Sequence, residues 1–156
     1  ITLRRICKYI YRQREKKVIS KNNYLIKKNI TIKTIQRNSE NLEKIQNIYQ
    51  KNIDLLDNYL SIVSWSKEIN VIYSDWISQI LDEILFWINC LELKNLWAIW
   101  IYLDDKMLQT KWMFYSLCKT LAFNDINILE ITSTYKEIVF FIKENDLKKA
   151  IEVLII

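Results

Sequence analysis

The sequence predicts an all-α protein: an irregular helical bundle or short helical array of about five or six helices, with a basic N-terminal arm. Three observations support this fold class. The 156 residues contain no glycine and no proline, the two residues that most often interrupt helices. Apolar side chains from Asn38 onward recur at three- and four-residue steps, the spacing of one helical face. Asn, Ser, Thr and Asp precede several of these runs, where they can cap helix N-termini.

The first predicted helix begins after Asn38, which is followed by Ser39 and the first-turn acid Glu40. Its apolar stripe continues at three-, four- and seven-residue steps for more than twenty residues. We therefore expect one long amphipathic helix whose apolar face is formed by Leu42, Ile45, Tyr49, Leu56, Tyr59 and Val63.

Two more helices are predicted in the middle of the chain. Ser74 and Asp75 can cap a second helix that continues to Ile88. Asn95 starts or interrupts a third, which runs to Leu121 before a turn at 124–125. Because the chain has no glycine, its helix ends must place Asn in the left-handed region or be sealed by side chains.

The C-terminal segment 134–154 looks like one helical hairpin of the tetratricopeptide or pentatricopeptide kind. Thr134 and Glu137 read as a capping box, and Leu147 begins the last helix after a break at 145–146. No second copy follows at the period of such repeats, and a solenoid needs about three of them. A generic helix pair is therefore expected, and no family is assigned.

Charge divides the chain into two predicted regions. Residues 1–37 hold 12 of the 23 Lys and Arg residues but only one of the 18 acids, whereas residues 38–156 are net acidic. This asymmetry predicts a basic arm and linker, 1–37, attached to a helical domain, 38–156. Residues 30–32 alternate as a strand would, so the linker is expected to be extended or to form an edge strand on another protein.

The arm is predicted to contact RNA, because cations spaced along a helical face and interleaved tyrosines suit a phosphate backbone with exposed bases. Two alternatives remain open: a solvated or partner-bound basic helix, and an interfacial helix on anionic lipid or a retained targeting segment. In the RNA hypothesis the phosphate contacts are Arg4, Arg5, Lys8, Arg12, Arg14, Lys16, Lys17 and Lys21.

Six tryptophans are more than one small core needs, so some of them are expected to bury against neighbouring proteins. Trp97, Trp100 and Trp112 are the candidates for such a protein interface. Trp65, Trp76 and Trp87 are spaced by 11 residues, about three helical turns. A ladder for stacking a ligand is one interpretation, and aromatic packing in a helix–helix core is the favoured one.

The composition excludes most catalytic chemistry. Without histidine there is no Ser-His-Asp or Cys-His arrangement, and without glycine there is no Walker loop or dinucleotide fingerprint. The three cysteines are scattered, which supports neither a disulfide scaffold nor a zinc site and indicates a reducing compartment. We therefore expect a protein that is not an enzyme, with no catalytic residue, no metal and no cofactor.

The stretch 84–103 is apolar and long enough to span a bilayer at roughly 20 residues. Glu92 and Lys94 lie at its centre, however, and each central charge costs about 3 kcal/mol on insertion scales. Two short helices that meet at 92–95 explain the same residues without that cost. Membrane contact is therefore the less favoured interpretation.

The functional hypothesis is a structural subunit of a large ribonucleoprotein assembly, a mitochondrial ribosomal protein in the first instance. Its arm would contact rRNA and its Trp-rich body would pack on neighbouring proteins. The mitochondrial matrix is the predicted location, because abundant Ile, Asn and Lys beside six Trp fit an AT-rich genome that reads TGA as Trp. The alternatives are a soluble cytoplasmic adaptor that binds other proteins and an accessory subunit of an inner-membrane complex.

Overall fold

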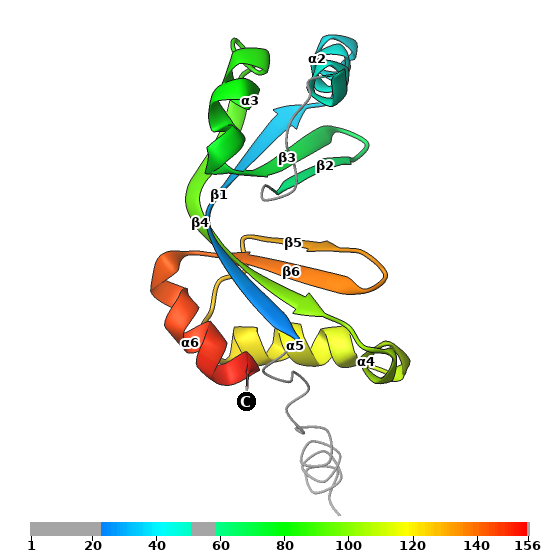
Figure 1. The fold of residues 1–156 in the computed structure, drawn as a ribbon, viewed down its shortest axis with the longest axis vertical. Coiled ribbons are helices and arrows are strands. Elements are labelled where there is room, and N and C mark those ends of the chain that lie inside the picture. Colours follow the sequence, from blue (N-terminus) through cyan, green and yellow to red (C-terminus); the bar gives the residue numbers. More distant parts are fainter. Residues whose placement is uncertain (1–22, 51–58, 156) are drawn as a thin grey trace, which may run out of the picture. The chain divides into compact units, whose positions relative to one another are not determined.

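A computed structural model of the chain describes residues 23–50 and 59–155. Strands and helices alternate along this part of the chain, so the fold is α/β (Figure 1). The strands are β1 (Tyr24–Gln36), β2 (Leu60–Ser64), β3 (Glu68–Ser74), β4 (Cys90–Tyr102), β5 (Glu130–Ser133) and β6 (Glu137–Ile142). The helices are α2 (Ser39–Gln50), the 3-10 turn η1 (Asp75–Ile77), α3 (Ser78–Ile84), α4 (Asp105–Gln109), α5 (Met113–Phe123) and α6 (Glu144–Leu154).

The strands form a six-stranded sheet in the order β2-β3-β1-β4-β6-β5. The β1–β3, β2–β3 and β5–β6 pairs are antiparallel. The predicted all-α bundle is therefore wrong. The chain is rich in Ile and aromatic residues, which suit a pleated, half-buried surface. Periodicity alone does not separate a short apolar strand from a buried helix segment.

The described residues divide into two compact units, one of residues 27–98 and the other of residues 23–26 with 99–155. We call them the 27–98 unit and the 99–155 unit. This division differs from the predicted boundary at residue 37, which stays a prediction because residues 1–22 lie outside the described part of the chain.

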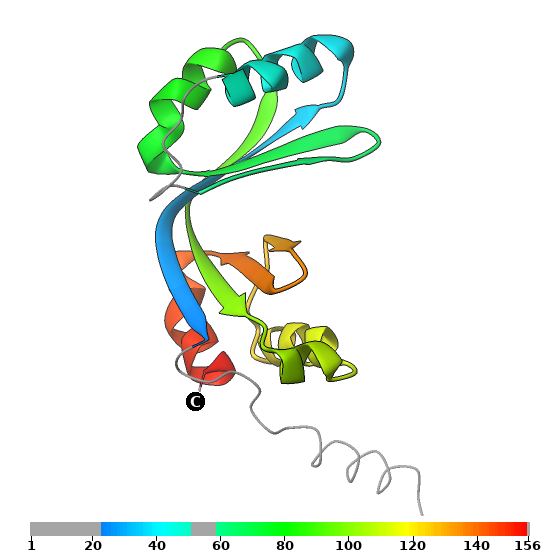
Figure 2. The same ribbon diagram turned by 45° about the vertical axis from the view of Figure 1, so that its right-hand side comes forward.

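In the 27–98 unit, α2 and α3 cover one face of the sheet formed by β1, β2, β3 and the start of β4 (Figure 2). Asn38 begins α2 as predicted, because its Oδ1 accepts the backbone N–H of Asn41 at 2.8 Å. Apolar side chains from the strands and both helices meet in one buried cluster. Its members are Ile35, Ile45, Ile48, Ile69, Val71, Tyr73, Ile77, Leu81 and Leu85.

The long first helix predicted from the stripe does not reach Val63. α2 is described as Ser39–Gln50, and residues 60–64 form β2, which pairs with β3. Leu60 and Ile62 pack at the edge of the core cluster from this strand. Tyr59 and Val63 therefore do not belong to the helix, and Leu56 lies outside the described residues.

In the 99–155 unit, the end of β4 is followed by α4, α5, the β5–β6 hairpin and α6 (Figure 1). Every residue of Ile138–Ile142 in β6 is buried. Phe141 meets Trp100 edge to face, with ring centroids 6.5 Å apart. Helices α5 and α6 contact each other. Their buried side chains are Met113, Leu117 and Leu121 on α5 and Ala150 and Leu154 on α6.

The end of α5 confirms the predicted turn at residues 124–125. The N–H of Ile126 donates to the carbonyl of Leu121, and the N–H of Asp125 donates to that of Ala122, both at 3.1 Å. These two bonds form a Schellman motif. Asp125 takes the left-handed position, with φ of 54°, where glycine is the usual residue.

Two other helix predictions are wrong. The third predicted helix is β4 up to Tyr102, and helices begin only after it, with α4 and α5. The predicted helical hairpin over 134–154 is a strand, β6, followed by α6. The N–H of Thr134 donates to the carbonyl of Glu137 in the β5–β6 turn, so these residues do not form a capping box. The last helix itself is confirmed, although it starts at Glu144.

Left-handed residues also occur inside strands. Asn29 in β1 and Asn95 in β4 have φ of 59° and 57°. Asparagine tolerates this region better than other non-glycine residues, so it takes the place of glycine where these strands bend. None of the helices in the described residues is both long and apolar enough to cross a membrane.

The two units share one order of elements. The 27–98 unit runs β1, α2, β2, β3, α3 and β4, and the 99–155 unit runs β4, α4 with α5, β5, β6 and α6. In each unit a strand leads into a helix, then into a hairpin, then into a second helix. The second helices, α3 and α6, therefore occupy equivalent places in the order of elements.

Candidate functional site

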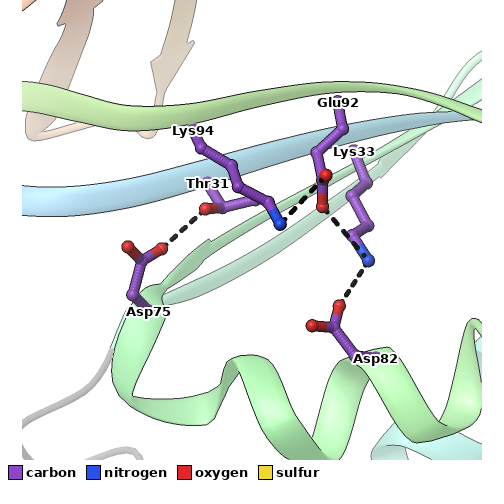
Figure 3. A network of polar contacts seen from close by, with 6 residues as sticks. All are labelled: Thr31, Lys33, Asp75, Asp82, Glu92 and Lys94. Carbon is purple, nitrogen blue, oxygen red and sulfur yellow. Dashed lines mark hydrogen bonds and ion pairs between the residues drawn. The ribbon is translucent and has the colours of Figure 1, made fainter.

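A network of charged side chains lies under α3, on the helix-covered face of β1 and β4 (Figure 3). Thr31, Lys33 and Ile35 alternate along β1 and therefore share one face of the strand. Ile35 belongs to the apolar core, whereas Lys33 brings an ammonium group onto the same face. The polar partners come from η1, α3 and β4. They are Asp75, Asp82, Glu92 and Lys94.

Lys33 is the centre of this network. Its side chain is only 9% exposed, and its ammonium donates to Asp82 on α3. The same ammonium lies 3.4 Å from Glu92 on β4, and Glu92 also pairs with Lys94 at 3.1 Å. The lysine therefore bridges a helix and a neighbouring strand.

A second polar contact fixes the turn that precedes α3. The hydroxyl of Thr31 donates to Asp75 in η1 at 2.6 Å. Thr31 and Lys33 thus hold the start and the middle of the η1–α3 segment from one face of β1. Among the described residues, no buried side-chain nitrogen or oxygen lacks a hydrogen bond, so the network leaves no buried polar atom unsatisfied.

Burial and charge act on Lys33 in opposite directions. Desolvation lowers the pKa of its ammonium, but the hydrogen bond and charge of Asp82, with those of Glu92, raise it, and the balance leaves the pKa above 10.5. Lys33 therefore stays charged at neutral pH. Burial raises the pKa of the nearby Tyr73 hydroxyl, and the charge of Asp82 adds to the rise. Tyr73 accordingly stays neutral in the folded protein.

An open groove of about 590 Å³ runs along α3. Ser78, Gln79, Asp82, Glu83 and Phe86 line it, so its lining carries two carboxylates and an aromatic ring. Asp82 belongs both to this groove and to the Lys33 network, which places the groove directly above a charged contact with the sheet.

Exposed aromatic rings surround α3. Trp76 is 85% exposed and Trp87 is 89% exposed, and Phe86 meets Trp87 edge to face with centroids 4.7 Å apart. Trp65 is exposed as well, in the turn between β2 and β3. The favoured prediction that Trp65, Trp76 and Trp87 pack in a helix–helix core is therefore wrong, because they lie in different elements and face solvent.

A second aromatic surface lies on α5. Trp112, Tyr115, Lys119 and Phe123 follow one another at three- and four-residue steps, so they share one helical face. The Lys119 ammonium lies 5.7 Å from the centroid of the Tyr115 ring and 5.5 Å from that of Phe123. These cation–π contacts order an exposed stripe on the 99–155 unit.

The residues predicted as sites fall elsewhere. All eight predicted RNA contacts, Arg4, Arg5, Lys8, Arg12, Arg14, Lys16, Lys17 and Lys21, lie outside the described residues. Trp100 is buried against Phe141, Trp97 is half-buried and Trp112 is 62% exposed. Their assignment to a protein interface stays a prediction.

Sequence reasoning missed the Lys33 network. Lys33 counted only as one more cation of a basic linker, Asp82 fell within a predicted helix, and Glu92 fell at a predicted turn between two helices. The usable signal was the alternation of Thr31, Lys33 and Ile35 with Ile30 and Ile32, which is the pattern of a strand with both faces buried. Within the described residues, no group of three or more Cys, Asp or Glu side chains could hold a metal ion.

Comparisons with known proteins find a family match in the C-terminal part of the chain and a shared fold. An ACT domain family model matches residues 105–155, which span α4 to α6 and less than half of the chain. No curated protein matches the sequence. Several solved structures match the fold, at low sequence identity.

The structure of aspartokinase alpha and beta subunits superposes with a TM-score of 0.66 at 14% identity, covering 85% of this chain and 94% of that one. The regulatory subunit of aspartate kinase from Thermus flavus gives 0.64 at 11% identity, with the same coverage of both chains. The aspartate kinase of Clostridium acetobutylicum, described as an allosteric enzyme, gives 0.65 at 16% identity. This chain covers 33% of that kinase, and 84% of this chain is aligned.

These findings overturn the predicted function. The ribosomal and RNA-binding hypotheses are contradicted by the ACT match and by the similar structures, neither of which involves RNA. A basic N-terminal segment signals an affinity for anions in general, so it did not by itself identify rRNA as the partner. The chain has the α/β fold of the regulatory subunits of aspartate kinase, to which it is similar in fold and not in sequence.

Proposed function

We propose that this chain is a small-molecule-binding regulatory domain whose effector is an amino acid. The observation that carries the proposal is the ACT match over α4 to α6, inside a fold shared with regulatory subunits of aspartate kinase. ACT domains bind amino-acid effectors and mediate regulatory oligomerisation. The chain matches about the length of isolated regulatory subunits, and a third of a whole kinase.

The chemistry of the chain supports a binding role over a catalytic one. The sequence has no histidine for proton transfer at neutral pH and no glycine-rich loop for a nucleotide phosphate. In the 27–98 unit, two lysines, Lys33 and Lys94, form ion pairs with two carboxylates, Asp82 and Glu92. In this proposal any catalysis under its control belongs to a separate domain or subunit.

The groove on α3 is the candidate position for the effector in the 27–98 unit. Carboxylates of Asp82 and Glu83 can accept hydrogen bonds from an ammonium group, and the ring of Phe86 offers an apolar contact. An amino acid has an ammonium group and, in many cases, an apolar side chain. The groove therefore presents matching chemistry to part of the ligand.

Thermal unfolding with each of the common amino acids tests the proposed function. A ligand that binds only the folded state at about 100 times its dissociation constant adds about 2.7 kcal/mol, which raises the melting temperature by several degrees in a domain of this size. We expect one or a few L-amino acids to produce this rise, and the D-enantiomers to produce much less. Isothermal titration should then give a saturable binding curve. No shift and no heat with any amino acid would overturn the proposal.

A pair of variants locates the site. Phe86→Ala should weaken binding by about tenfold if the effector occupies the groove, because it removes one apolar contact. Phe123→Ala is the matched control, since Phe123 is 72% exposed on α5, outside the groove. Equal affinity in both variants would move the effector to another surface and leave the proposed function intact.

A further inference from the structure

We propose that the η1–α3 segment, residues 75–84, opens as a separate element of the 27–98 unit, and that the Lys33–Asp82 ion pair holds it closed. This inference goes beyond effector binding and does not depend on it. It rests on how the segment is attached to the sheet and on what becomes of the buried ammonium when that attachment breaks.

The segment has little stability of its own. α3 has seven residues, and isolated helices shorter than about 12 residues are marginal in water. Its N-cap residue Ile77 offers no side-chain hydrogen bond, and the Ser74 side chain before η1 accepts the N–H of Tyr59 instead of capping. The segment is therefore held by its contacts with the rest of the unit.

Apolar attachment involves one side of the segment. Ile77, Leu81 and Leu85 are buried in the core cluster, whereas Trp76 and Phe86 on the same stretch are 85% and 61% exposed. Ile84 and Ile88 pack against the same cluster from its edge. The attachment of the segment therefore combines this apolar contact with polar contacts to β1, which orient it.

The polar contacts are placed along the segment. Asp75, at its start, accepts the hydroxyl of Thr31, and Asp82, near its end, accepts the ammonium of Lys33 (Figure 3). Because Thr31 and Lys33 lie on one strand, both contacts break when the segment leaves the sheet. Asp82 is already 47% exposed and therefore regains hydration at low cost.

The second partner of Lys33 makes this opening accessible. Leaving a buried charge without a partner is strongly destabilising, and this would oppose any movement of Asp82. Glu92, however, lies on β4, which neighbours β1 in the sheet, and stays 3.4 Å from the ammonium when the helix moves. On opening, Lys33 therefore loses one of its two carboxylate partners and keeps the other.

This arrangement predicts opposite effects for two isosteric substitutions. Asp82→Asn weakens a contact that exists only in the closed state, so it favours opening. In Glu92→Gln, Lys33 still pairs with Asp82 in the closed state but has no carboxylate partner in the open state, so the substitution opposes opening. Both substitutions remove one carboxylate from Lys33. If the network only stabilised the fold, both would therefore change the opening of α3 in the same direction.

Native-state hydrogen exchange of the full chain measures both effects. In Asp82→Asn, the amides of 78–85 should exchange about tenfold faster than in the wild type, as expected for a lost charge-assisted hydrogen bond. In Glu92→Gln, the same amides should exchange more slowly or at the wild-type rate, while those of β3 exchange faster. Acceleration of 78–85 in Glu92→Gln, or no acceleration in Asp82→Asn, would overturn the proposal.

Two further measurements serve as controls. Lys94→Met removes an exposed partner of Glu92, and it should leave the exchange of 78–85 within about twofold of the wild type, because the Lys33–Asp82 contact is kept. In the wild type alone, exchange of 78–85 should depend weakly on low denaturant concentrations, whereas that of β3 should depend strongly on them. If the exchange of both segments depended equally strongly on denaturant, α3 would open only by global unfolding, and this would contradict the inference. This measurement uses the wild type, so it holds even if a variant fails to fold.

Discussion

The second helices of the two units, α3 and α6, follow the same order of elements but are attached by different chemistry. α6 has 11 residues and buries Ala150 and Leu154, and the five residues of β6 before it, Ile138–Ile142, are all buried and apolar. α3 has seven residues and lies over a strand that carries a buried lysine. Shared topology therefore does not determine how firmly an element is held.

The difference has an energetic meaning. Apolar burial contributes about 1.5–3 kcal/mol for each large side chain and needs no partner of opposite charge. A buried ion pair roughly repays its own desolvation, so it adds orientation more than stability. In the 27–98 unit the second helix combines apolar contacts with an ion pair to the sheet, whereas the buried side chains of α6 in the 99–155 unit are apolar.

The largest effect on stability is expected in the 99–155 unit. Phe140→Ala removes a fully buried ring from β6 and should lower the free energy of unfolding by about 3–5 kcal/mol. Urea unfolding followed by circular dichroism measures the loss. Phe123→Ala, which removes an exposed ring of α5, should cost less than about 1 kcal/mol. Similar losses in the two variants would show that β6 is not the centre of this unit.

A smaller effect is expected at the charged attachment. Asp82→Ala should cost about 1–2 kcal/mol, less than a fully buried pair would, because Asp82 is half exposed and Lys33 retains Glu92. Glu83→Ala is the matched control, since Glu83 neighbours Asp82 on α3 and lines the groove without a close cation among the ion pairs found in the described residues. The control should change stability by about 0.5 kcal/mol or less. A loss at Asp82 as large as that at Phe140 would remove the contrast between the units.

The sequence predicted some elements and missed the sheet. The start of α2 at Asn38, the turn at 124–125 and the last helix were predictable, because caps and turns depend on a few neighbouring side chains. The alternation at 30–32 marked part of β1, although it was assigned to a linker. The other strands were not predicted, since the pairing of distant strands leaves no local mark beyond alternation. β6 reads as a continuous apolar run, which a buried helix segment would match equally well.

The absence of glycine and proline also misled the fold prediction. Glycine supplies left-handed residues at turns and bulges, so its absence suggested a chain with few turns. The structure places Asn29, Asn95 and Asp125 at such positions instead, together with two tryptophans, Trp87 and Trp112. The Lys33 network could not be predicted for the same reason as the sheet, because its members are up to 63 positions apart and meet only when β1 lies beside β4.

The smallest expected effect is a stabilisation of the 99–155 unit. Asp125 occupies the left-handed position of the Schellman motif at the end of α5, where a side chain costs free energy that glycine avoids. Asp125→Gly should raise the free energy of unfolding by about 0.5–1 kcal/mol, even though glycine gains entropy in the unfolded chain. Asn124→Gly is the control, because φ of −104° at that residue needs no glycine, and it should be neutral or destabilising. If both substitutions destabilise the protein, the Asp125 side chain contributes more to this helix end than its backbone strain removes.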